Sequence, residues 1–403
     1  IWEFELDLTA EQIEFLILHL WELRHSIYFP YYYHYENCSY QLLALLEVIN
    51  ANWDLTSFYS YVLPVETIKK LASQTTFKTI QFRPSLKAQL LARYEKLNSD
   101  EKDHFSHLTQ ISTPLTDAQK SASYSITTLD AALAYMTYLK HKEHGAVSDD
   151  FKNRQHTLLT LRSKILEPSP PLNLPPHERS PDHAHPSIRL QLGVQYYRQS
   201  PSLVLGFRPG IHDLLSRHEG YIESTQLEAL EIRARWDTQP SRFRLERFDF
   251  FRAISLFPLH TLMKRPSWFI RAVWKEPENM SCLNCIVPQA STALGAASRL
   301  GMKSTILSIF AWTFFEKNPH LPSYTLQAGP LAMALIELKQ DVKLWAQWTM
   351  FHPLAGENPV KKWTHKFSLE GSYIFTDRWE LRPSAEAVMN GSVKTQLNLH
   401  YYF

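Results

Sequence analysis

Cys38 stands where a cysteine could act as a nucleophile in this 403-residue chain. An aromatic, strand-like run at residues 27–33 leads toward Asn37, and an apolar helical pattern follows over residues 41–48. Asn37 is a good helix N-cap, which would place Cys38 in the first helical turn. Free backbone N–H groups and the positive end of the helix dipole favour a thiolate there. From these residues alone, a nucleophilic thiol and a buried structural cysteine are equally good interpretations.

The two other cysteines, Cys282 and Cys285, form a C-x-x-C pair in an expected loop at residues 276–288. No second pair completes a four-ligand zinc site, and no βαβ pattern supports a thioredoxin-like motif. We interpret the pair as a local disulfide, which is typical of an oxidising compartment. Cys38 is then the free thiol.

The chain offers little evidence for a metal, a cofactor or nucleic acid. His177, His183 and His185 lie in a proline-rich stretch, where linker polarity explains them better than a metal site does. The sequence lacks a glycine-rich phosphate loop, a His-Glu-x-x-His motif and a Gly-x-Ser-x-Gly motif. A formal net charge of +2 gives no bulk attraction to nucleic acid. We therefore predict no metal site, no cofactor and no nucleic-acid partner.

Two different kinds of element must position the cysteines. Residues 1–166 show apolar residues at helical spacing, with a capping box at residues 9–12, and are expected to be mostly helical. Residues 167–187 hold seven prolines and are expected to be an extended linker. From residue 188 to 403 the period of the apolar residues changes to two, which predicts about twelve strands. The fold class is therefore α+β, a helical domain followed by an antiparallel β-barrel.

The last strand is the best evidence that the barrel spans a membrane. One face carries apolar residues and threonine, and the other carries polar residues: Thr395, Leu397, Leu399, Tyr401 and Phe403 against Gln396, Asn398 and His400. A lipid-facing row beside a lumen row is typical of a membrane barrel, as is the alternation of short and long connections. Residues 244–249 break the alternation, and a soluble β-sandwich is the alternative. The polar connection at 210–221 is expected to be a structured periplasmic turn.

Aromatic residues near the expected strand ends would form the interfacial girdles of such a barrel. The candidates are Tyr196, Tyr197, Trp236, Trp268, Trp274, Trp312, Trp345 and Trp348.

Several stretches carry a resemblance to a known family. They are residues 2–6, 19–23 and 36–43 in the first half, and residues 185–190 and 212–215 beyond the linker. In them the chain resembles a bacterial family with the N-terminal periplasmic domain of Lnb, the lipoprotein intramolecular transacylase. The resemblance covers both halves of the chain and is closest around the cysteine at position 38.

The resemblance implies a periplasm-facing domain similar to circularly permuted papain-like enzymes. In those enzymes a cysteine follows an asparagine at a helix start, and a histidine lies earlier in the chain. Cys38 corresponds to the nucleophile and Asn37 to its cap. No histidine carries over, because the segment expected to hold it would precede Ile1; we expect an N-terminally truncated fragment. His34 matches no family position and would need a tight bend to reach the sulfur.

The function implied is a periplasm-facing cysteine acyltransferase or hydrolase on an outer-membrane barrel, acting on lipoprotein or lipid acyl groups. The alternative is a non-enzymatic barrel, a channel or an assembly factor, with a periplasmic interaction domain. Thiol reactivity distinguishes them, since a nucleophile reacts quickly at neutral pH and a buried structural cysteine does not. The substrate, the acyl acceptor and the oligomeric state stay open.

Overall fold

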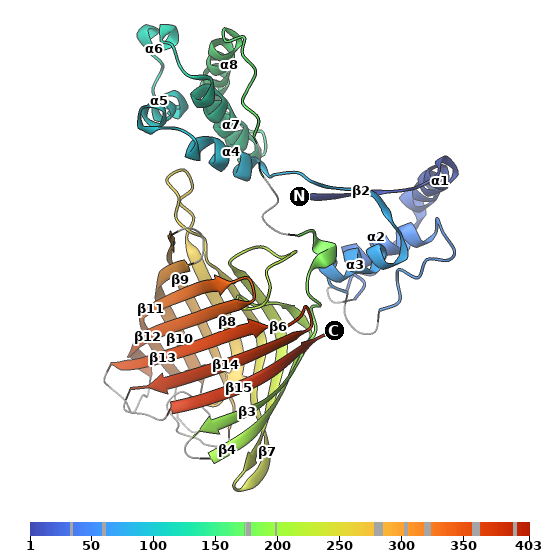
Figure 1. Cartoon of the computed structure of the whole chain (residues 1–403), viewed down its shortest axis with the longest axis vertical. Coiled ribbons are helices and arrows are strands. Elements are labelled where there is room, and N and C mark those ends of the chain that lie inside the picture. The colour runs from blue at the N-terminus through green and yellow to red at the C-terminus, as the bar shows by residue number, and fades with distance from the viewer. Residues whose placement is uncertain are drawn as a thin grey trace. The chain divides into compact units, whose positions relative to one another are not determined.

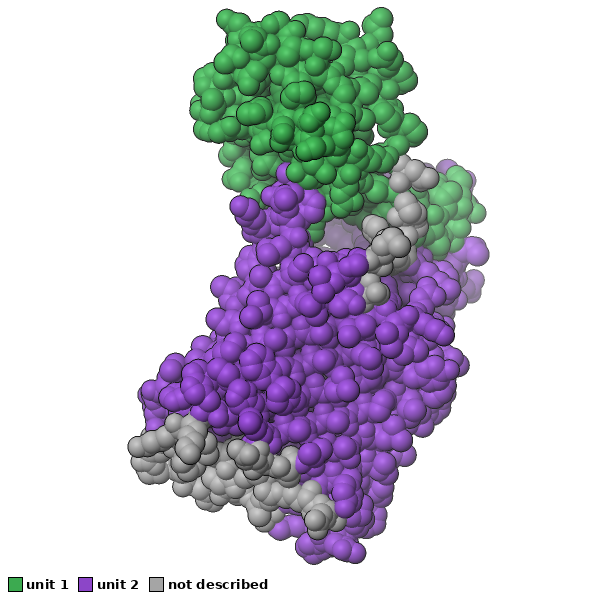
Figure 2. Space-filling view, turned by 60° about the vertical axis from the view of Figure 1, so that its left-hand side comes forward, with its two compact units in different colours: residues 1–7, 77–177 green, residues 8–76, 178–403 purple. Residues whose placement is uncertain are grey.

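The structure is a computed structural model. It describes residues 1–32, 35–58, 62–172, 174, 179–197, 200–277, 285–301, 305–317, 324–356, 363–389 and 393–403. These residues form two compact units, residues 1–7 with 77–177 and residues 8–76 with 178–403 (Figure 2). Each unit is described below by itself.

The smaller unit is a set of helices beside a two-stranded sheet. Strand β1 (Trp2–Leu6) pairs antiparallel with β2 (Phe77–Phe82). The helices are α4 (Leu86–Glu95), α5 (Ser99–Thr109), α6 (Asp117–Ser121), α7 (Ile126–Lys142) and α8 (Asp149–Ser163). Each begins after a residue whose side chain accepts a backbone N–H of the first turn, the pattern that starts helices in water. Their buried side chains include Leu90, Phe105, Leu108, Leu129, Met136 and Leu158.

The larger unit begins with three helices, α1 (Ala10–Ser26), α2 (Cys38–Glu47) and α3 (Pro64–Gln74), which confirm the helical character predicted for this part of the chain. The expected capping box starts α1, since Thr9 and Gln12 bond each other's backbone. Among the described residues, no helix combines the length and the apolar character needed to cross a membrane. The permuted papain-like arrangement stays a prediction.

The rest of this unit is a closed antiparallel barrel, coloured green to red in Figure 1. Its strands are β3 (Arg189–Tyr197), β4 (Ser200–Arg208), β6 (Thr225–Thr238), β7 (Ser241–Ser255), β8 (Ser267–Lys275), β9 (Val287–Leu300), β10 (Thr305–Lys317), β11 (Tyr324–Lys339), β12 (Val342–Gly356), β13 (Thr364–Ile374), β14 (Trp379–Val388) and β15 (Val393–Tyr402). Pairing of β15 with β3 and of β4 with β6 closes the ring of twelve. A short strand, β5 (Gly210–His212), adds to β6. The predicted twelve-stranded barrel is confirmed.

Strands β3 and β4 turn polar side chains to the inside of the barrel and apolar side chains to the outside. On β3, Arg189, Gln191 and Gln195 are buried, whereas the side chains between them are exposed, with Leu192 at 59%. The same alternation runs along β4, where Ser202 and Arg208 are buried. A soluble β-sandwich would bury the apolar face instead. The exterior is that of a barrel surrounded by lipid.

Two of the tryptophans expected in the aromatic girdles lie inside the barrel instead. Trp345 is buried in the interior, and Trp312 packs against the same apolar cluster. Tyr196, Trp236 and Trp274 are exposed near strand ends, as a girdle requires. Neighbouring positions of a strand face opposite sides of the sheet. Whether an aromatic residue faces lipid or the lumen therefore depends on its position along the strand.

Candidate functional site

Cys38 is the first residue of helix α2, and Asn37 is the N-cap. The Asn37 Oδ1 atom accepts the backbone N–H groups of Ser39 at 3.1 Å and Tyr40 at 3.2 Å, and also the Ser39 hydroxyl. The Asn37 Nδ2 atom donates to the carbonyl of Val62 at 2.6 Å. The buried asparagine therefore both starts the helix and ties it to the chain before α3.

The thiol of Cys38 is free and exposed to solvent. A buried structural cysteine, the second interpretation open at the sequence level, does not fit this position. None of the described residues forms a hydrogen bond or ion pair with the thiol, and His34 lies outside the described residues. Cys285 is disulfide-bonded. Its expected partner, Cys282, lies outside the described residues. No group of three or more His, Cys, Asp or Glu side chains in the described ranges is arranged to hold a metal.

Helix α3 is fixed to the segment that enters the barrel. The Glu66 carboxylate accepts the backbone N–H of Ser187 at 3.0 Å and its hydroxyl at 2.6 Å. The Lys69 ammonium donates to the carbonyl of His185 at 2.8 Å and lies 3.2 Å from the Glu66 carboxylate. Burial lowers the pKa of Lys69. These contacts couple the helices around Cys38 to the start of β3.

His185 and His212 belong to a buried cluster of rings. The Nε2 atom of His185 lies 3.1 Å from Nδ1 of His212, and the His212 ring stacks on Tyr221 with centroids 4.4 Å apart. Burial lowers the pKa of His185 to about 3 and raises the pKa of Tyr221 to about 12. Both groups are neutral at pH 7. The cluster is thus a packed junction, and His185 is not a linker residue exposed to solvent.

Acid is expected to loosen this junction. His185 stays neutral when folded down to a pKa of about 3, whereas its ordinary value is 6.5. Below pH 6.5 the locally unfolded form binds a proton at His185 that the folded form does not. The contribution of His185 to the stability of the junction therefore decreases by roughly 1.4 kcal/mol for each unit by which the pH is lowered. Hydrogen exchange of residues 185–187 and 210–221, corrected for intrinsic rates, measures this free energy. A His185→Gln variant should show a flatter pH dependence; an unchanged slope would contradict the assignment.

The connection after β5 lies at the periplasmic end of the barrel and is structured, as expected, and it also folds into the barrel. The carboxylate of Asp213 is buried among three arginines from separate strands: Arg189 at 2.6 Å, Arg208 at 2.9 Å and Arg382 at 2.6 Å. Its Oδ1 also accepts the backbone N–H of Leu215 at 3.0 Å and of Ser216 at 2.9 Å. Glu231, Glu228 and Glu380 also contact Arg189, Arg208 and Arg382, respectively. Asp213 is the carboxylate that all three arginines share, and it turns the chain inward.

The segment Asp213–Arg217, here called the plug segment, reaches the other strands as well. Leu214 and Leu215 pack into a buried cluster with inward residues of β7–β12. The Lys343 ammonium donates to the Ser216 carbonyl at 2.7 Å, and the Ser216 hydroxyl lies 3.0 Å from that of Tyr402. Since these contacts come from all around the ring, the plug segment obstructs the lumen at this level.

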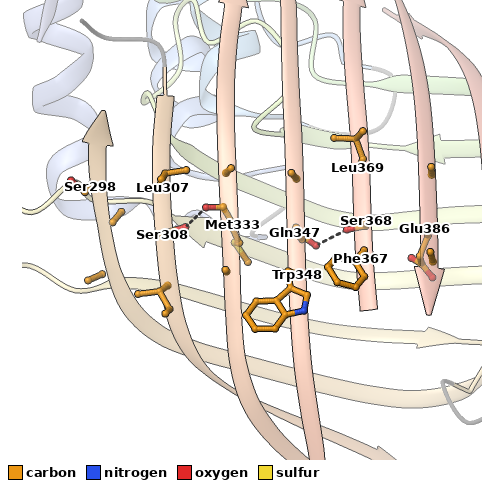
Figure 3. A pocket seen from close by; sticks show the side chains of 18 of the residues that line it. Ser298, Leu307, Ser308, Met333, Gln347, Trp348, Phe367, Ser368, Leu369 and Glu386 are labelled. Carbon is orange, nitrogen blue, oxygen red and sulfur yellow. Dashed lines mark hydrogen bonds between the residues drawn. The ribbon is translucent and has the colours of Figure 1, made fainter. Parts of the chain in front are cut away.

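Two of the hollows in the described part of the barrel differ in character. One is apolar and is lined by β9–β14 (Figure 3); Trp348 and Phe367 are cross-strand partners there, and Glu386 is its one charged lining residue. The other is a polar cavity of about 660 Å³ inside the barrel, and half of its lining residues are charged. Of these two, the second hollow has the groups that could recognise a charged ligand.

Comparison with known families gives matches along most of the chain. The Lnb N-terminal periplasmic domain matches residues 1–74. Two domains of unknown function follow, DUF7842 over residues 80–173 and DUF7840 over residues 178–402. No curated relative matches the sequence. The periplasmic domain and the barrel with its apolar exterior confirm the predicted location, an outer-membrane barrel with its N-terminal domain in the periplasm.

Several solved structures match part of this chain at low identity and low TM-score. The KdgM porin is 9% identical with a TM-score of 0.31, over 53% of this chain and 99% of that one. An outer membrane channel from Pseudomonas putida F1 is 11% identical with a TM-score of 0.35, over 57% and 100%. The translocator domain of autotransporter NalP from Neisseria meningitidis is 12% identical with a TM-score of 0.27, over 55% and 90%.

Proposed function

The chain belongs to the family of the domain of unknown function DUF7840, whose match covers every strand of the outer-membrane barrel, and we propose that the periplasmic part performs cysteine-dependent acyl transfer or hydrolysis. Cys38 is the nucleophile, and Asn37 positions it. Lipoprotein or phospholipid acyl groups are the substrates, because the domain lies on the periplasmic side of a lipid surface.

The observation that carries this proposal is the exposed thiol at the first residue of α2. It lies within the stretch that matches the Lnb N-terminal periplasmic domain. Reactive cysteines occupy helix N-termini that are accessible to solvent, whereas structural cysteines are buried. Asn37 fixes the helix start by two backbone bonds and one bond to Val62, so the thiol is held on a defined backbone.

The reaction proceeds through a thioester. The Cys38 thiolate adds to the acyl carbonyl carbon, the bond from that carbon to the ester oxygen breaks, and the alcohol leaves with the proton that the thiol gave up. An amine or water then attacks the thioester, releases an amide or an acid, and restores the thiol. Asn37 already binds the N–H groups of Ser39 and Tyr40, so the N–H of Cys38 is the first-turn amide, within the described residues, that can stabilise the oxyanion.

Trapping of the thioester tests the proposal. The full chain in detergent, mixed with p-nitrophenyl palmitate, should gain the mass of one palmitoyl group at Cys38, and neutral hydroxylamine should remove it. Cys38→Ala should show no such adduct, while Ser39→Ala, which keeps the thiol, should retain it. An adduct that persists without the thiol, or no adduct in the wild type, would contradict the proposal.

Absence of a palmitoyl adduct in the wild type would favour the non-enzymatic alternative. In that case the N-terminal helices form an interaction domain, and the coupling of α3 to the barrel through Glu66 and Lys69 serves assembly. The plug segment disfavours an open channel, because its buried contacts cross the lumen. Slow alkylation of Cys38 at neutral pH would accompany this alternative.

A further inference from the structure

Strands β6, β7 and β8 bring arginines directly opposite one another on the inner wall of the barrel. The cross-strand pairs are Arg233 with Arg247, Arg235 with Arg244, and Arg252 with Arg271. Like charges at directly opposed positions destabilise a sheet unless something else neutralises them. Three such pairs on one wall therefore need a source of negative charge.

Carboxylates of the same wall neutralise two of the pairs. Glu231 lies 3.1 Å from Arg233 and 2.9 Å from Arg247. Asp237 likewise bridges Arg235 and Arg244.

The third pair is only half neutralised. Asp249 lies 2.6 Å from Arg271, and it also binds Arg247. Within the described part of the chain, no carboxylate lies within ion-pair distance of Arg252, and its Nε atom has no hydrogen-bond partner. The Nη2 atom of Arg271 also has none among the described residues. Glu228, opposite Arg252 on β6, is already bound to Arg208 at 2.8 Å.

These arginines line the cavity of about 660 Å³ inside the barrel. Its lining holds seven arginines and three lysines but five acidic residues. With Glu231 and Asp249, which bind lining arginines from beside the cavity, the excess is three positive charges (10 − 7). The cavity extends to the hairpin ends at Ser200 and Pro240, opposite the end at which β3 begins. Arg252 also lines a smaller cavity with Asp213 and Leu215 of the plug segment, so it lies toward the closed end.

The plug segment lies at the end at which the chain enters from the periplasmic domain. The polar cavity is therefore a cup that is obstructed toward the periplasm and reaches the hairpin ends on the outer side. Such a shape suits binding of a solute and opposes free passage through the barrel. Its volume is within the range of small-molecule sites, about 300–1,000 Å³.

We propose that this cup binds a water-soluble anion with two or more phosphate or carboxylate groups, which Arg252 and Arg271 hold at its closed end. Arginine guanidinium groups bind such oxyanions with paired N–H donors. The anion supplies the negative charge that the Arg252–Arg271 pair lacks. This binding site lies in the barrel and is independent of the proposed chemistry at Cys38.

Calorimetric titration of the full chain in detergent with pyrophosphate tests the site. We expect saturable binding of one pyrophosphate per chain that weakens as salt rises, with no binding of the neutral sugar trehalose. Arg252→Gln and Arg271→Gln should each weaken binding by about 10-fold or more, and Arg252→Lys by less. Arg265→Gln, an exposed arginine outside the cavity, serves as the matched control and should bind as the wild type does.

A measurement of thermal stability separates ligand binding from a structural role. Because Arg252 faces Arg271 without a carboxylate of its own, Arg252→Gln should leave the melting temperature of the unliganded protein unchanged or raise it. Lost binding with unchanged or higher stability supports the proposal. Equal pyrophosphate affinity in Arg252→Gln and the wild type, no saturable binding by the wild type, or lower stability together with lost binding would each overturn it.

Discussion

Replacement of Asp213 by alanine is expected to release the plug segment and let ions through the barrel. Asp213 is the shared partner of Arg189, Arg208 and Arg382, and all four side chains are buried. Removing one partner of a buried ion pair costs about 3–5 kcal/mol, because the remaining charge is left without compensation. Here the three guanidinium groups lose their common partner but keep Glu231, Glu228 and Glu380, so we expect a cost near the lower end, about 3 kcal/mol. Two backbone bonds that turn the chain inward are lost as well.

Single-channel recording in planar bilayers measures the result. The wild type should show little conductance, and Asp213→Ala should show discrete openings. Asp377→Asn is the matched control: Asp377 contacts Arg217 of the same segment but is exposed, so its loss should cost about 0–1 kcal/mol and leave the lumen obstructed. In a Cys38→Ala background, Leu215→Cys should be protected from a bulky thiol reagent until Asp213 is replaced. Equal conductance and equal protection would contradict the role of the plug segment.

Local sequence pattern sufficed to predict the barrel because its physical cause is local. Alternation of lipid-facing and lumen-facing residues repeats every two positions, so β15 alone carries the signal. The broken alternation at residues 244–249 has a local explanation too. The register shifts there, with Leu245 opposite Ala234 and Arg247 opposite Arg233, so that Glu246 is the extra residue of a β-bulge. Glu246 and Arg247 can then both line the lumen.

Which tryptophan faces lipid could not be predicted from residue type. A tryptophan at a strand end suits both a girdle and a core, and a one-residue change of register reverses its side. Trp345 is two positions from Lys343 and lies on the same face of β12, and both side chains are buried. A lysine on that face is the signal in the sequence that would have placed Trp345 inside the barrel.

The plug segment was missed for a different reason. Asp213 meets Arg382 across 169 residues of sequence, and only the closed ring brings them together. The buried arginines at the ends of β3 and β4 were a usable signal, since an inward arginine needs a carboxylate. The helix start at Cys38, in contrast, depends on the adjacent Asn37 and could be predicted.

An arginine on the outer face of β3 is expected to destabilise the barrel according to its depth in the membrane. Leu192 lies near the middle of β3 and is 59% exposed, whereas Tyr196 lies near its end and is 53% exposed. An arginine at the middle of the hydrocarbon layer costs about 2–4 kcal/mol, and one near the interface about 0–1 kcal/mol. Leu192→Arg should therefore lower the unfolding free energy in lipid vesicles by the larger amount and Tyr196→Arg by the smaller.

The paired variants distinguish a membrane barrel from a soluble one. Both positions face outward on the same strand and are exposed to nearly the same fraction, so in water the two arginines would have similar and small effects. Only a surrounding hydrocarbon layer makes depth matter, because it offers no water to the guanidinium at position 192. Urea titration of the barrel folded in vesicles measures both free energies. Equal losses for the two variants would mean that the apolar exterior faces a protein partner or solvent and not lipid.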